Sequence, residues 1–233
     1  MGKTAFCLEI ALNIIKNYEL PVLVFSLEMS KEQVIYRLLA SETKISNLKL
    51  KSANISKYNW TLLSETIQIL SSLPLFIDDT PGLIVEQIRT KVRNILFEQA
   101  KIGLIIIDYL QLMQNSKFQI DNRVQELSLI TRSLKNIARE FNVPVMALSQ
   151  LSRSVENRIN KRPILSDLRE SGSIEQDADL VLMLYRDSYY NFISQPLDIA
   201  ELIIAKHRNG PIGTIKLQFD AKSAKFSNYI ENE

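Results

Sequence analysis

The chain has 233 residues, of which 46% are hydrophobic and 23% charged, and its formal net charge is +2. These values are typical of one soluble globular domain over residues 1–233. They exclude disordered and fibrous classes, and the overall charge does not mark a nucleic-acid binder. One cysteine and one histidine exclude an internal disulfide, a Cys/His zinc site and a Ser-His-Asp hydrolase.

The N-terminal part predicts a helix, a strand and a second helix. Residues 5–17, AFCLEIALNIIKN, carry apolar residues at helical spacing, and residues 21–27, PVLVFSL, are a short β-branched run that begins at a proline. Ser30 precedes KEQVIYRLLASE with Gln33 in the position of a capping-box partner, so we expect the second helix to begin there.

The next part of the chain predicts short helices, a small strand and a long helix. Residues 46–72 are polar and weakly periodic, which favours short helices. Residues 74–79, PLFIDD, predict a small strand that is closed by the turn DDTPG. The stretch 83–99, LIVEQIRTKVRNILFEQ, has a strong helical stripe.

Two further strands flank the longest predicted helix. Residues 102–108, IGLIIID, are a continuous apolar run, as a strand buried on both faces of a parallel sheet requires. Residues 123–141 predict the longest helix, and residues 143–150, VPVMALSQ, predict another buried strand. Because strands and helices alternate, we predict an α/β class with a mostly parallel sheet flanked by helices.

The C-terminal part changes character. Residues 151–179 have little core material, and a segment of that length without regular structure is usually functional or disordered. Residues 180–186, 199–208 and 213–220 then predict three strands, the last two joined through NGPIG, which has the chemistry of a hairpin turn. We therefore expect an antiparallel C-terminal hairpin.

The opening MGKTAF contains the tripeptide Gly2, Lys3 and Thr4, the last letters of a phosphate-binding loop. A helix N-terminus presents unpaired N–H groups, Lys3 adds a positive charge for phosphate oxygens, and Thr4 adds a hydroxyl for Mg²⁺. The alternative is three common residues at a ragged end, and only the context separates the two interpretations.

Three polar residues follow predicted buried strands and give that context. Asp108 ends LIIIDY, where a magnesium-binding acid is expected in a phosphate-binding enzyme, the alternative being ordinary turn chemistry. Glu28 ends VLVFSLEMS and is placed to orient an attacking water, the alternative being helix capping. Gln150 ends VMALSQ, where an amide can sense a γ-phosphate. All of these residues converge on one edge of one sheet.

Two basic segments are candidates for binding anions outside this site. Between Arg153 and Arg162, four basic residues (153, 158, 161 and 162) and one acidic residue (156) give a local charge of +3. Arg153 and Arg158 are therefore candidates for single-strand phosphates, the alternative being a solvated loop. Lys206 and Arg208, at a hairpin tip, have the spacing to reach an anion on a neighbouring subunit. The alternative is edge-strand protection.

The chain resembles the C-terminal ATPase domain of the hexameric replicative DNA helicases of the DnaB family over nearly its whole length. The matching segments are GKTAF, FSLEMS, IIIDYLQLM, ALSQLSR, LRESGSIEQDAD and KHRNGPIG. The last two are the specific ones, because a shared phosphate-loop core does not explain them. The resemblance implies a RecA-like fold whose first strand is missing here, a ring of six subunits, ATP hydrolysis with Mg²⁺, and translocation on single-stranded DNA.

The resemblance also implies roles for individual residues. In the nucleotide site, Gly2, Lys3 and Thr4 hold phosphates and Mg²⁺, Glu28 polarises the water, Asp108 is an acid of the metal site, Gln150 couples nucleotide state to DNA, and Arg37 lies near the nucleotide. Outside it, Lys206 and Arg208 reach the neighbour's γ-phosphate, and Arg169, Glu170 and Gly172 belong to the pore loop that holds the DNA backbone.

The chain also departs from the family pattern. The strand and loop residues before Gly2, the helical N-terminal domain and the linker helix that engages primase are not in this chain, so we expect a C-terminal fragment that is not a competent helicase as it stands. One alternative is a non-catalytic DNA-binding or subunit-interaction module. The other is a RecA-type recombinase, and the segments LRESGSIEQDAD and KHRNGPIG argue against this second alternative.

The expected partners are single-stranded DNA, five further copies in a homo-hexamer, primase and other replisome proteins, with no membrane. The amino-acid usage leans towards Ile, Asn and Lys, as the proteins of AT-rich genomes do. Together with the expected lack of a transit peptide, this usage favours the plastid stroma or the bacterial cytoplasm as the compartment.

Overall fold

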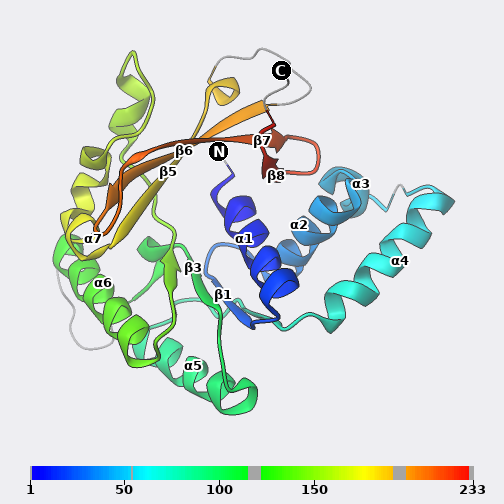
Figure 1. Cartoon of the computed structure of the whole chain (residues 1–233), viewed down its shortest axis with the longest axis horizontal. Coiled ribbons are helices and arrows are strands. Elements are labelled where there is room, and N and C mark those ends of the chain that lie inside the picture. The colour runs from blue at the N-terminus through cyan, green and yellow to red at the C-terminus, as the bar shows by residue number, and fades with distance from the viewer. Residues whose placement is uncertain (1, 54, 115–121, 191–197, 231–233) are drawn as a thin grey trace.

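Figure 1 shows a computed structural model of the chain, which describes residues 2–53, 55–114, 122–190 and 198–230, with the side chains of 169–172 left out. It contains two four-stranded sheets. The parallel sheet has the order β2-β1-β3-β4 and consists of β1 (Val22–Ser26), β2 (Leu75–Asp78), β3 (Leu104–Asp108) and β4 (Val145–Ala147). The antiparallel sheet has the order β5-β6-β7-β8 and consists of β5 (Leu180–Arg186), β6 (Asp198–His207), β7 (Gly213–Asp220) and β8 (Lys225–Asn228).

The helices cover both faces of the parallel sheet. The α-helices are α1 (Lys3–Tyr18), α2 (Lys31–Thr43), α3 (Asn47–Lys51), α4 (Lys57–Ser72), α5 (Val85–Gln99), α6 (Arg123–Glu140) and α7 (Gly172–Asp177). Short 3₁₀ turns are η1 (Leu110–Leu112), η2 (Arg153–Asn157), η3 (Leu165–Ser171) and η4 (Asp187–Tyr189). Among the described residues, none of the helices combines the length and apolar character needed to cross a bilayer.

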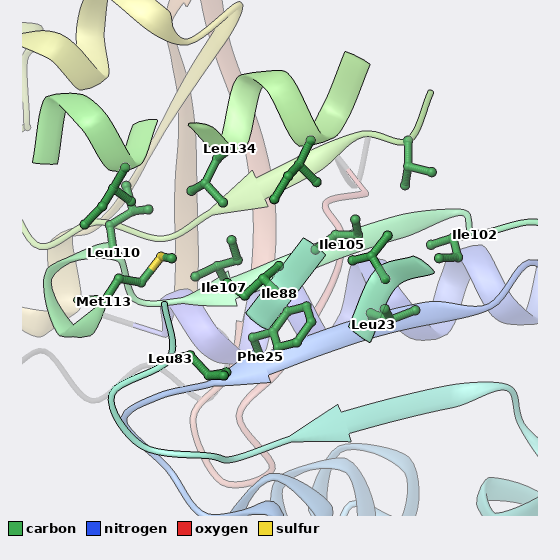
Figure 2. Close-up of a cluster of buried hydrophobic side chains, with 14 of the residues drawn as sticks. Leu23, Phe25, Leu83, Ile88, Ile102, Ile105, Ile107, Leu110, Met113 and Leu134 are labelled. Atoms are coloured by element: carbon green, nitrogen blue, oxygen red, sulfur yellow. The ribbon is translucent and has the colours of Figure 1, made fainter. Parts of the chain in front are cut away.

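Every residue of β1 and of β3 is buried because helices pack on both sides of these strands. Successive side chains of a strand point to opposite faces. Phe25 and Ile107 therefore join a cluster with α5 and α6, whereas Val24 and Ile106 join a second cluster with α1 and α2. Figure 2 shows Phe25 in the first cluster beside Leu83, Ile88 and Ile107. The continuous apolar runs read from the sequence thus correspond to strands buried on both faces.

The antiparallel sheet lies across the end of the parallel sheet near the start of α1 (Figure 1). Phe226 of β8 packs its ring at 5.5 Å, edge-on, against that of Phe6, and at 4.6 Å from that of Phe219. Ala5 of α1 belongs to the same cluster. Aromatic contacts of this kind add to burial, so β8 fixes the position of the α1 N-terminus.

The predicted order of elements is confirmed, with two corrections and one additional strand. β4 is only half-buried, not a buried strand, because among the described strands it pairs with β3 alone. Residues 46–72 form one short and one long helix, α4, which is weakly periodic because it buries little beyond Leu63 and Thr66. The predicted antiparallel hairpin is confirmed as β6 and β7. The predicted strand β5 and the further strand β8 extend it to a four-stranded sheet.

Candidate functional site

The start of α1 is a helix N-terminus that no side chain caps. Gly2, the residue before the helix, has φ 99° and ψ 21°, a left-handed conformation that glycine adopts without steric cost. A Cβ at Gly2 would lie 3.2 Å from the Phe226 ring. The first N–H groups of α1 therefore carry the positive end of the helix dipole without a side-chain acceptor, as an anion site requires.

Thr4 and Asp108 form the centre of the site. The Thr4 hydroxyl donates to Asp108 Oδ2 over 2.6 Å, and Asp108, at the end of β3, is 3% exposed. The two residues meet because α1 packs on the sheet next to β3, where Ser26 pairs with Asp108. A hydroxyl and a carboxylate are hard oxygen ligands, and Mg²⁺ usually takes one or two such protein ligands together with substrate phosphates. These residues fit a magnesium ion bound in that way.

Lys3 lies between the ends of three strands. Its ammonium donates to the carbonyl oxygen of Ser149 over 2.9 Å, past the end of β4. Burial lowers the pKa of Lys3 below its ordinary value, while the negative charges of Asp108 and Glu28 act in the opposite direction. The structure therefore confirms the convergence of Lys3, Thr4 and Asp108 at one sheet edge.

Gln150 reaches the same edge in a different way from that predicted. β4 ends at Ala147, so Gln150 follows a half-buried edge strand, and the residue is exposed. Gln111 of η1, which the sequence did not single out, holds it: Gln111 Oε1 accepts the Gln150 N–H over 3.3 Å, and Gln111 Nε2 donates to Ser149 Oγ over 2.9 Å. Gln111 and Ser149 belong to the segments IIIDYLQLM and ALSQLSR, so the signal for them was present in the sequence.

Glu28 is exposed beyond the end of β1, beside Leu27, whose N–H donates to the Asp108 carbonyl oxygen over 2.7 Å. The capping alternative is excluded, because Ser30 caps α2: Ser30 Oγ accepts the Gln33 N–H, and the Gln33 side chain accepts the Ser30 N–H in return. Glu28 thus remains available to solvent at the sheet edge that carries Lys3.

Arg37 lies away from the strand ends. It is a partly buried residue of α2 and lines a narrow crevice between α1 and α2, together with Glu9 and Ser41. Ala5, next to Thr4, lines the same crevice. The structure therefore places Arg37 along one side of α1, and the predicted contact with a nucleotide stays a prediction.

Lys206 and Arg208 point to the C-terminal end of α7. Lys206 Nζ donates to the Glu175 carbonyl oxygen over 2.5 Å, and Arg208 Nη2 donates to that of Gln176 over 2.9 Å. The Asp179 carboxylate lies 3.5 Å from the Arg208 guanidinium. Cations at a helix C-terminus satisfy carbonyl groups that the helix leaves unpaired. Within one chain, these two cations therefore hold the helix that begins at Gly172.

The loop predicted to hold DNA is anchored at both ends. Arg169 and Glu170 belong to η3 and Gly172 begins α7, and nothing is described of their side chains. Before the loop, the Asp167 carbonyl oxygen accepts the Ser152 N–H over 3.0 Å. After it, Thr131 of α6 donates to the Asp177 carboxylate over 2.6 Å. Hydrogen bonds thus hold the chain in place on both sides of the loop.

The basic segment 153–162 is less free than its charge suggests. Arg158 Nη2 pairs with the buried Asp167 over 2.6 Å. Arg162 forms a bidentate pair with Glu201 over 2.7 and 2.8 Å, which raises the pKa of its guanidinium. Arg153 is exposed. Of the two predicted DNA contacts here, Arg158 thus has a role inside the fold, and Arg153 faces solvent.

Replacing Arg158 with methionine is expected to lower the free energy of unfolding by about 1–3 kcal/mol, because the buried Asp167 carboxylate loses its guanidinium partner. Among the contacts of the described residues, it then keeps the Ile164 N–H, 2.8 Å away, as a donor. Arg153→Met is the matched control and should stay within about 0.5 kcal/mol. Urea unfolding followed by circular dichroism measures both. Equal stabilities of the two variants would show that the Arg158 pair does not stabilise the fold.

Cys7 of α1 is expected to resist thiol reagents in the folded chain. Burial raises the pKa of its thiol from 9.0 to about 12. Its sulfur lies 3.4 Å from the Met146 sulfur. At pH 8 the native chain should therefore react with iodoacetamide far more slowly than the urea-unfolded chain.

The same shift of the Cys7 pKa predicts a pH dependence. An unfolded thiol ionises near pH 9 and the folded one only near 12, so the unfolding free energy should fall as pH rises through this window. Cys7→Ala is the comparison variant and should show a shallower fall. Identical slopes for the two proteins would contradict the assignment.

Comparisons with known proteins identify the family of the chain and its fold. The family model described as the DnaB-like helicase C-terminal domain matches residues 1–228. The chain is 68% identical over 233 residues to the probable replicative DNA helicase of Trieres chinensis. This match covers 99% of the chain and 51% of that protein. It is 51% identical over 228 residues to the replicative DNA helicase DnaC of Bacillus subtilis (strain 168), covering 98% of this chain and 50% of that protein. The chain thus spans about half the length of the curated relatives it matches.

A solved structure gives the same result. A DnaB-like replicative helicase, described with its interactions with primase, has a TM-score of 0.93 and 44% identity, over 99% of this chain and 55% of that one. The likeness confirms the predicted RecA-like α/β class.

Proposed function

The chain belongs to the family of DnaB-like helicase C-terminal domains, and from this premise we propose that it is the ATP-hydrolysing part of a replicative DNA helicase. In that role it couples hydrolysis to translocation on single-stranded DNA and to unwinding at the replication fork. The observation that carries the proposal is the Thr4–Asp108 hydrogen bond of 2.6 Å at an uncapped helix N-terminus beside Lys3.

The nucleotide phosphates are proposed to lie at the start of α1. The backbone N–H groups after Gly2 would donate to a phosphate oxygen, and the Lys3 ammonium, already partly desolvated, would neutralise its charge. Thr4 and Asp108 would hold Mg²⁺, which neutralises charge that develops on the phosphate oxygens during transfer. The Thr4 hydroxyl is fixed by Asp108 before any ligand arrives, so these groups need little reorganisation.

Glu28 and Gln150 are proposed to act on the γ-phosphate side. Glu28, an exposed carboxylate near Lys3, orients the attacking water and accepts its proton. Gln150 senses the terminal phosphate through its amide. Arg37 stays a proposal for a contact farther along the nucleotide, on the α2 side of α1.

Lys206 and Arg208 are proposed to serve a neighbouring copy in a homo-hexamer. A trans-acting cation stabilises charge in the transition state only when the neighbour is in place. In the isolated chain both residues bind carbonyl groups of α7, so engagement with a neighbour's phosphate exchanges one set of acceptors for another. The exchange links hydrolysis to the helix that follows the DNA loop.

Single-stranded DNA is proposed to bind the loop that carries Arg169, Glu170 and Gly172, with Arg153 as an outer phosphate contact. Arg153→Ala should weaken the binding of single-stranded DNA whatever the DNA sequence. It should also reduce the slope of the logarithm of the binding constant against the logarithm of the salt concentration by about 1. Primase is proposed as a further partner, since the solved relative is described with primase. The compartment is proposed to be the plastid stroma or the bacterial cytoplasm, as the relatives come from the alga Trieres chinensis and from Bacillus subtilis.

The test of this function uses a joined protein, in which the Bacillus subtilis DnaC residues that precede the matched region are fused to this chain. We expect ATP turnover stimulated by single-stranded DNA and unwinding of a forked duplex. Lys3→Ala should lower turnover about a hundredfold or more with DNA binding retained, whereas Lys222→Ala, at an exposed lysine, should leave turnover unchanged. Salt-sensitive DNA binding without turnover in the unsubstituted joined protein would instead indicate a non-catalytic module.

A further inference from the structure

The side chain of Gln111 has no part in the function proposed above, yet it lies between two segments of the site. β3 ends at Asp108 and the chain turns into η1, so the ladder between β3 and β4 stops at the pair Ile107 and Ala147. The next backbone contacts are the Leu148 N–H to the Ile107 carbonyl oxygen and the Leu110 N–H to the Leu148 carbonyl oxygen, each over 2.9 Å. Beyond Leu148, the chain that carries Gln150 has lost its neighbouring strand.

The carboxamide of Gln111 takes the place of that strand. Its Oε1 accepts the Gln150 N–H over 3.3 Å, and its Nε2 donates to the Gln150 carbonyl oxygen over 3.4 Å and to Ser149 Oγ over 2.9 Å. The main chain of Gln111 is itself held, because its carbonyl oxygen accepts Arg123 Nη2 over 2.7 Å at the start of α6. One planar amide thus pairs with both polar backbone groups of Gln150, as a strand partner would.

We propose that Gln111 is a positioning residue of the nucleotide site, a role that rests on the proposed function. Its carboxamide fixes the peptide segment whose Ser149 carbonyl oxygen receives the Lys3 ammonium over 2.9 Å, and it fixes Gln150 on the same segment. A side-chain amide offers a donor and an acceptor side by side, which neither a thioether nor an ionised carboxylate does. Methionine has a similar length without these groups, and glutamate sets a second acceptor against the Gln150 carbonyl oxygen.

The first arm of the test is hydrogen exchange of single amides, measured by NMR on the 233-residue chain. In Gln111→Met, the Gln150 amide should exchange about tenfold faster or more, because its acceptor is gone. The Leu148 amide, bonded to Ile107, should keep its rate. Gln68→Met, at an exposed glutamine of α4, is the matched control and should change neither rate. An unchanged Gln150 rate in Gln111→Met overturns the proposal.

The second arm is ATP turnover in the joined protein. Gln111→Met should lower kcat about tenfold to a hundredfold while KM for ATP changes little, since a small displacement of reacting groups costs rate more than binding. Adding Gln150→Ala to Gln111→Met should cost much less than Gln150→Ala costs alone, because the two residues act as one unit.

The outcomes separate this inference from the proposed function. Faster exchange at Gln150 with unchanged turnover, or fully additive losses, would overturn the positioning role alone. An inactive unsubstituted joined protein would defeat the proposed function and, with it, the effect of Gln111 on turnover, whereas the hydrogen-exchange arm would still test whether Gln111 holds Gln150. A raised KM with unchanged kcat would place Gln111 in ground-state binding and also count against the proposal.

Discussion

Asp108→Asn is expected to lower ATP turnover of the joined protein about a hundredfold to a thousandfold. Asparagine keeps the shape of the side chain and can still accept the Thr4 hydroxyl, which the Asp108 carboxylate now accepts over 2.6 Å. The variant loses the negative charge that attracts Mg²⁺ and that opposes the lowering of the Lys3 pKa. Steady-state turnover at saturating ATP and DNA measures the loss, and circular dichroism verifies that the variant is folded.

Asp79→Asn is the matched control for this experiment. Asp79 follows β2 at the same edge of the sheet, but its carboxylate accepts the Lys31 backbone N–H over 2.9 Å and does not contact Thr4. Its turnover should stay close to that of the unsubstituted protein. If Asp108→Asn were as active as Asp79→Asn, Asp108 would not belong to the metal site.

Phe25→Ala should lower the free energy of unfolding by about 3–5 kcal/mol. Phe25 is 2% exposed and lies in the cluster between the parallel sheet and helices α5 and α6 (Figure 2). Its removal leaves a cavity that the surrounding isoleucines and leucines of the strands and helices cannot fill without distortion. Urea unfolding of both proteins, fitted with the same dependence of the unfolding free energy on urea concentration, gives the difference in that free energy.

Phe97→Ala tests whether burial causes that loss. Phe97 lies on α5 and is 92% exposed, so its truncation should change the free energy of unfolding by no more than about 0.5 kcal/mol. Similar losses for the two variants would mean that Phe25 does not lie in the principal core.

Much of the site could be predicted because its signals are local. Lys3, Thr4 and Asp108 lie in short motifs next to apolar runs. Parallel strands have their carboxyl ends at the same edge of the sheet, so residues that follow such strands are expected to lie close together. The helices and strands could be predicted for the same reason, because the spacing of apolar residues and the residues typical of turns are also local signals. The capping box at Ser30 was likewise readable, since both of its partners lie within four residues.

The parts that were missed depend on distant partners. The contact of Gln111 with Gln150 joins residues 39 positions apart, and Arg158 finds Asp167 only because the segment 151–179 folds back on itself. The half-burial of β4 depends on its place at the sheet edge, which its apolar composition does not reveal. β8 was missed because only Phe226 of its four residues is buried. The contacts of Lys206 and Arg208 with α7 likewise required the sheet and helix to be placed together.

The most direct test of the central claim is a cryo-electron microscopy map of the joined protein with Mg²⁺ and a non-hydrolysable ATP analogue. We predict phosphate density at the N-terminus of α1 against Lys3, with the metal bound by Thr4 Oγ1 and close to Asp108. Nucleotide density elsewhere, such as in the crevice beside Arg37, with no density at Thr4, would contradict the account.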